Sequence, residues 1–147
     1  MRRRHLLALA AGVAAAGCSG RPALREDTDR HDIDYGDSVR YDLDVRTPFT
    51  LEYDLRVLAG PPVDVVVVAP EHVENFLSGE QVPYANGATQ FDTDGITVQA
   101  NVWAGRWAVL IANGAGADGT GERATASFHY RVRRYVPYGS GDEAGPS

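Results

Sequence analysis

A period-two alternation of apolar and polar residues runs through most of the middle of the chain and constrains its fold more than any other feature. In residues 38–46, Val, Tyr, Leu and Val alternate with Arg and Asp. Residues 49–57 and 123–133 repeat this alternation with other residue types. Because successive side chains of a strand point to opposite faces, each segment is predicted to be a half-buried strand.

Residues 63–69 differ, because they form a nearly continuous apolar stretch that is rich in valine. A run of this length after the Gly-Pro-Pro at 60–62 predicts a central strand that is covered on both faces. Pro70 then begins a short helix over 71–77, with acidic residues in its first turn and Ser-Gly after its end. It is the only helix that the sequence predicts in the domain.

Three more strands are predicted at residues 88–92, 96–103 and 107–112. The short joins at 93–95 and 104–106 have the composition of tight hairpin turns, so these strands are expected to pair with one another in sequence. Seven or eight short strands with one short helix predict an all-β, antiparallel β-sandwich.

The N-terminus has the organisation of an export signal, which we place at residues 1–17. A basic start is followed by a mostly Leu/Ala run of about a dozen residues, whereas a membrane span needs ~20. Arg3 and Arg4 before this run resemble a twin-arginine signal, which exports folded proteins. Cys18 follows Ala-Ala-Gly and is the single cysteine of the chain, so we expect it to be the lipidated mature N-terminus. The alternative is an ordinary small residue in an uncleaved leader.

Composition and charge divide the remainder of the chain. Residues 18–37 are predicted to be the lipidated cysteine and a flexible tether, 38–136 the β-sandwich domain, and 137–147 a disordered tail.

The chain contains 14 Arg, no Lys and 20 acidic residues; removing Arg2, Arg3 and Arg4 leaves 11 Arg against 20 acids, a net charge of −9. Such a surface repels nucleic acid. The Lys-free, Asp-rich composition resembles that of proteins from salt-loving archaea.

Two segments carry a resemblance to known families. Residues 63–80 resemble the strand and acidic short helix of GOLD-like β-sandwich domains, and residues 103–113 are similar to a hairpin of those domains and of prepeptidase C-terminal domains. The resemblance covers about residues 38–136 and implies a jelly-roll-like sandwich that is used for binding and has no catalytic residues. GOLD cargo receptors also have a disulfide, a coiled coil and a transmembrane helix, which this sequence does not show, so cargo-receptor function is not implied.

Trp103 is the main candidate for a binding residue. It falls in the outward phase of the predicted strand together with Gln99 and Asn101. An exposed tryptophan beside amides can serve as a stacking platform for a sugar or a protein partner. The alternative is that Trp103 packs under the short helix or a loop, as large aromatic residues usually do.

Arg131, Arg133 and Arg134 form the basic cluster of the predicted domain. One expectation is that they pair across strands with outward acids, namely Asp42, Asp44, Glu52 or Asp54. The other is that they form an edge that binds an anion or a partner.

The sequence offers no catalytic or metal-binding motif, so we expect no enzyme activity, no metal and no cofactor. Three histidines lack metal-ligand spacing and are expected to be solvated: His31, His72 and His129. Asp92–Gly95 is expected to be a turn rather than a calcium loop, and Asp118–Gly121 a flexible loop rather than a protease motif. Ser127 and His129 lie near each other in sequence without a nucleophile elbow, so a hydrolase is disfavoured.

The sequence therefore predicts a lipoprotein on the outer face of the cell membrane, held there by the lipid on Cys18. Its β-sandwich is expected to be a binding or adaptor module with a protein or glycan partner at the cell envelope. The alternatives are a carbohydrate-recognising envelope protein that uses Trp103, Gln99 and Asn101, and less favoured, a small hydrolase.

Overall fold

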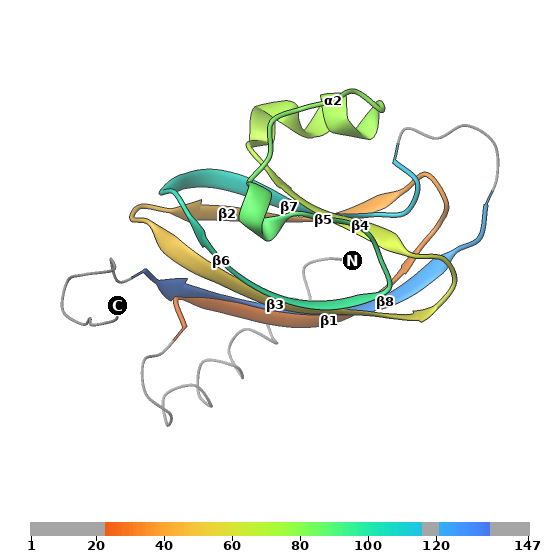
Figure 1. The fold of residues 1–147 in the computed structure, drawn as a ribbon, viewed down its shortest axis with the longest axis horizontal. Coiled ribbons are helices and arrows are strands. Elements are labelled where there is room, and N and C mark those ends of the chain that lie inside the picture. Colours follow the sequence, from red (N-terminus) through yellow and green to blue (C-terminus); the bar gives the residue numbers. More distant parts are fainter. Residues whose placement is uncertain (1–22, 116–120, 136–147) are drawn as a thin grey trace.

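Two four-stranded antiparallel sheets pack face to face in the computed structural model, which describes residues 23–115 and 121–135 (Figure 1). Sheet A has the strand order β1-β8-β3-β6 and sheet B the order β2-β7-β4-β5. The strands of sheet A are β1 (Arg25–Ile33), β8 (Ala124–Arg134), β3 (Phe49–Ala59) and β6 (Gly95–Val102). The strands of sheet B are β2 (Ser38–Val45), β7 (Gly105–Ala112), β4 (Val63–Val68) and β5 (Gln90–Thr93).

The strand pairing is nested. β1 pairs with β8, β2 with β7, β3 with β6, and β4 with β5, and further pairs of β3 with β8 and β4 with β7 complete the sheets. This eight-stranded, double-sheet arrangement is a jelly roll. The predicted all-β antiparallel sandwich is therefore confirmed.

The two predicted hairpins are wrong. The chain crosses from sheet B to sheet A at Asp94, between β5 and β6, and returns to sheet B before β7. At the second crossing Gly105 has a φ of 139°, a backbone conformation that residues with a Cβ rarely adopt. Gly and Asp permit any sharp change of direction, so the turn residues marked the bends correctly without showing which strands pair.

The predicted tether over residues 18–37 is also wrong in part, because residues 25–33 form β1. Its nine residues pair with β8 from Arg25 opposite Val132 to Ile33 opposite Ala124. β1 is an edge strand of sheet A and carries charged side chains that point inward, a device that discourages pairing with another sheet edge. The sandwich domain therefore begins before residue 38.

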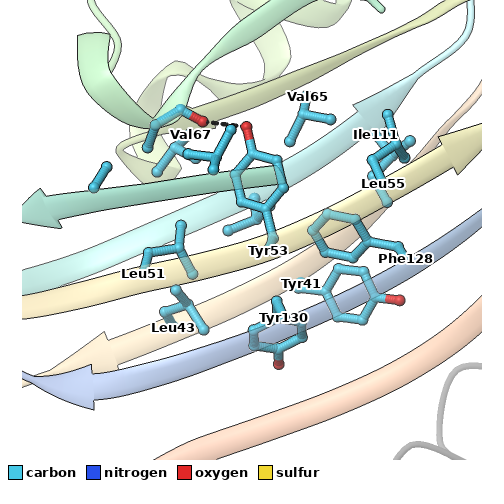
Figure 2. Close-up of a cluster of buried hydrophobic side chains, with 14 of the residues drawn as sticks. Tyr41, Leu43, Leu51, Tyr53, Leu55, Val65, Val67, Ile111, Phe128 and Tyr130 are labelled. Carbon is cyan, nitrogen blue, oxygen red and sulfur yellow. Dashed lines mark hydrogen bonds between the residues drawn. The ribbon is translucent and has the colours of Figure 1, made fainter. Parts of the chain in front are cut away.

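Apolar side chains from both sheets form the main core, part of which is drawn in Figure 2. Val65 and Val67 of β4 belong to this core, whereas Val66 and Val68 belong to a smaller cluster on the other face of sheet B. All four are fully buried. The prediction that this valine run is a central strand covered on both faces is confirmed.

The second face of sheet B is covered by the predicted short helix. It consists of a 3-10 turn, η2 (Pro70–His72), followed by α2 (Val73–Leu77), which lies outside the sandwich over sheet B (Figure 1). Val73 is buried against the valines of β4, and Phe76 and Leu77 pack beside it. Within the described residues, no helix is long and apolar enough to cross a membrane.

Candidate binding surfaces

Trp103 is the most exposed large apolar residue on the described surface, with 79% of its surface accessible. It lies one residue beyond β6, and its backbone carbonyl accepts a hydrogen bond from the Trp107 indole nitrogen at 3.0 Å. Trp107 itself packs against the main core. The core thus fixes the backbone at Trp103 while the indole ring faces solvent, so the expectation that Trp103 packs under the helix or a loop is wrong.

Gln99 and Asn101 are exposed on the outer face of sheet A, as predicted. Gln99 lies opposite Glu52 of β3, and Asn101 lies opposite Thr50. The Thr50 hydroxyl donates a hydrogen bond of 2.8 Å to the Asn101 side-chain oxygen. The amide nitrogen of Asn101 keeps its capacity to donate hydrogen bonds outward.

Arg131 and Arg133 share this outer face, but they do not form an edge, because β8 lies between β1 and β3. The Arg131 guanidinium lies 3.4 Å from a Glu26 carboxylate oxygen and 4.0 Å from one of Glu52, and Arg133 lies 3.3 Å from Glu52. Pairing across strands with outward acids, Glu52 among them, was one of the two expectations for these arginines. These acids balance much of the arginine charge and weaken the case for an anion site. Arg134 is exposed at the end of β8.

His129 lies on the same face with its ring nitrogen 2.7 Å from Glu26. It is therefore partnered, not simply solvated as predicted. A shallow depression of about 180 Å³ surrounds it, between β3, β6 and β8. Ser127 is two residues away on the same strand, which places its backbone about 7 Å from that of His129. No described contact joins the two side chains as a nucleophile and a base.

A row of inward-facing polar residues on β1 escaped prediction because the segment was assigned to the tether. The ring of His31 lies 2.6 Å from the Tyr41 hydroxyl, the Arg25 guanidinium donates to the Asp42 carbonyl at 2.6 Å, and Asp27 is buried. Burial is the main cause that raises the Tyr41 pKa well above its ordinary value, and nearby carboxylates add to it. This row closes one side of the sandwich with polar contacts in place of apolar ones.

A groove of about 400 Å³ between α2 and β5 was not predicted either. Its lining combines apolar and polar side chains from three consecutive segments: Phe76, Glu80, Gln81, Val82, Tyr84 and Phe91. No short motif connects these residues, so only the path of the chain over sheet B brings them together.

Metal-binding geometry is not found in the described ranges, where no group of three His, Cys, Asp or Glu side chains could hold an ion. Asp92–Gly95 covers the end of β5, the crossing at Asp94 and the start of β6, and the Asp64 carboxylate accepts a hydrogen bond from the Asp92 amide at 2.7 Å. The predictions for Arg3, Arg4, Cys18 and the Asp118–Gly121 motif concern segments that include residues outside the described part of the chain.

These observations define an eight-stranded jelly-roll domain with an exposed tryptophan and an aromatic groove. No family model matches the chain, and a search of curated proteins returns no match. One similar solved structure is the pre-peptidase C-terminal domain of a collagenase from Bacillus anthracis. It is 14% identical, with a TM-score of 0.47, and the match covers 74% of this chain and 89% of that chain. At this level of similarity, the fold assignment rests on the strand order of the chain itself.

Proposed function

We propose that the protein is a lipid-anchored, non-catalytic binding or adaptor module that faces the outside of the cell membrane. The observation that carries the binding role is the 79% exposed Trp103 on a backbone fixed by the core. Exposing so large an apolar ring is unfavourable in water, and exposed tryptophans are enriched where proteins bind partners. The end of β6 that leads to Trp103 presents Gln99 and Asn101 on the outer face of sheet A, where their amides can donate and accept hydrogen bonds.

Cys18 and the two arginines at positions 3 and 4 support the anchor and the export route. With β1 included in the sandwich, only six residues separate Cys18 from Arg25. A fully extended segment of that length reaches about 20 Å. A lipidated Cys18 would therefore hold the domain close to the membrane, and the partner would be another component of the cell envelope.

The favoured partner is a protein or a glycan at the envelope. A glycan is the more specific alternative, because an indole ring can stack on a sugar ring while neighbouring amides bond its hydroxyl groups. Nucleic acid is disfavoured, because an acidic surface repels phosphate groups.

Trp103→Ala is expected to remove partner binding and to leave the fold intact. The ring buries little of its own surface in the domain, so its loss should change the free energy of unfolding by about 0.5 kcal/mol or less. Binding should weaken by about 2 kcal/mol or more, as for a central interface tryptophan. In-cell crosslinking of the anchored protein measures the captured partners, and a thermal melt of the purified domain measures stability.

Leu58→Ala is a matched control, because Leu58 is also a large exposed apolar residue of sheet A, at 50% accessibility. The Leu58→Ala variant should retain both the melting temperature and the crosslinked products of the parent protein. Release of the captured component by free sugars would favour a glycan partner over a protein. An unchanged crosslinking profile for Trp103→Ala would exclude this surface from the binding role.

Cys18→Ser is expected to release the protein from the membrane or to leave an unprocessed precursor. The thiol is the atom that a lipid would be attached to, and serine cannot form the thioether. Membrane fractionation together with the mass of the N-terminal peptide measures the effect. Retention in the membrane with an unchanged N-terminus would contradict the lipoprotein proposal.

A further inference from the structure

The groove beside α2 contains an aromatic pair that the proposed function does not use. The rings of Tyr84 and Phe91 meet with their centroids 5.3 Å apart and their planes at 78°. Both residues line the groove, and they are 40% and 46% exposed. Two nearly perpendicular rings form a corner, so a ligand seated there meets aromatic surface on two sides. Phe76 of α2 contributes a third ring to the lining.

The sandwich holds this corner in place. The segment after Tyr84 is tied to sheet B, because the Ala85 amide donates to the Val67 carbonyl at 2.8 Å and the Val67 amide donates to the Thr89 hydroxyl at 3.1 Å. The buried Tyr53 hydroxyl donates to the Ala88 carbonyl at 2.6 Å, the dashed contact in Figure 2. Phe76 and Val82 pack on the cluster beneath α2. The lining is therefore largely preformed.

The chain segment that forms the groove is acidic and has no arginine or lysine. Residues 57–105 contain no Arg or Lys. They contain six acidic residues: Asp64, Glu71, Glu74, Glu80, Asp92 and Asp94. Glu80 lines the groove itself, beside Gln81. The next basic residues in sequence are Arg56 in β3 and Arg106 near the start of β7, the strand that pairs with β4.

We propose that this groove binds a small organic cation with an alkylated ammonium group. Aromatic ring faces attract such cations through their quadrupoles, and a carboxylate at the rim adds charge attraction. A volume of about 400 Å³ lies in the range of small-molecule sites. The Glu80 carboxylate in the lining opposes an anion. This site is separate from Trp103, so neither proposal depends on the other.

Titration calorimetry with choline as the probe tests the proposal on the full folded chain. The comparison ligand is the neutral isostere of choline, in which a tert-butyl group replaces the trimethylammonium group. Choline is expected to bind with one site per chain and about tenfold more tightly than the isostere, because only the charged ligand gains the cation–π and carboxylate terms. Equal affinities, or no saturable binding of choline, would overturn the proposal.

Three variants locate the site. Phe91→Leu keeps an apolar side chain but removes a ring, so choline should bind about tenfold more weakly while the isostere is little affected. Glu80→Gln keeps the shape and removes the charge, so choline affinity should fall about threefold and lose part of its salt dependence. Trp103→Ala should leave choline binding unchanged. A choline affinity that Phe91→Leu does not alter, in a variant with the parent's melting curve, would place the cation elsewhere and overturn the assignment.

Discussion

Val67→Asp is expected to abolish cooperative folding of the domain. Val67 is fully buried in the core between the two sheets, on a strand that has paired neighbours on both sides. The substitution places a carboxylate among apolar side chains, and no basic group is among the residues of that core. Burial of an unpaired polar or charged group costs about 4 kcal/mol or more, out of a total stability of about 5–15 kcal/mol. Circular dichroism during thermal unfolding measures the outcome.

Leu58→Asp provides the control, because it introduces the same carboxylate at a position that is 50% exposed near the end of β3. Its free energy of unfolding should change by about 0.5 kcal/mol. Val65→Asp should behave like Val67→Asp, since both side chains enter the main core. A cooperative melt near the parent's temperature for either core variant would contradict the placement of β4 at the centre of sheet B.

Most of the fold could be predicted from periodicity because six of the eight strands, all except β1 and β5, bury an apolar face. The alternation placed β2, β3 and β8 within a few residues of their observed bounds, and the valine run identified β4. The first strand lacks this signal. Its inward positions include Arg25, Asp27 and His31, so a pattern based on hydropathy could not distinguish it from a tether. Partners from distant segments, such as Tyr41, make those inward polar groups tolerable.

Strand pairing could not be predicted for a different reason. In a jelly roll, most consecutive strands lie in opposite sheets, and the pairs join segments that are far apart in sequence. Turn residues report only local backbone conformation, so the Gly residues at 95 and 105 were compatible with hairpins and with crossings between sheets. The register between distant strands is set when the apolar faces of both sheets are buried together. A short stretch of sequence does not contain this information.

The candidate sites, like the strands, include some that could be predicted from the sequence and some that could not. The outward phase of Gln99 and Asn101 could be predicted from the strand alternation, whereas the sequence left open whether Trp103 is exposed or packs under the helix or a loop. The partners of Arg131 could be predicted only in part, because Glu26 lies on the unrecognised β1. The groove near Tyr84 depends on how the chain passes from α2 to β5, where neither strand nor helix periodicity applies. A proline and glycine-rich connection of this kind carries little information about which side chains meet.

Gly60→Ala is expected to lower the free energy of unfolding by about 3 kcal/mol. Gly60 connects β3 to β4 with a φ of 92°, and a Cβ at this position would lie 2.1 Å from the Arg123 carbonyl oxygen and 2.9 Å from the Ala124 Cα. These are backbone atoms at the start of β8, so relief requires the strand itself to move. The left-handed conformation costs about 1–2 kcal/mol for a residue with a Cβ, and overpacking adds about 1–3 kcal/mol. A melt should show a decrease of roughly 15 °C.

Gly36→Ala separates the cost of the left-handed backbone conformation from the cost of overpacking. Gly36 has nearly the same φ, 90°, in the turn between β1 and β2, but an added Cβ would meet no atom within 4 Å. Only the conformational cost applies there, so its loss should be about 1 kcal/mol, or roughly 5 °C. The difference between the two variants then measures how firmly β8 is held against the β3–β4 connection. Equal losses would mean that β8 yields freely at Arg123, and the close approach of these segments would contribute nothing to the rigidity of the sheet that carries Trp103.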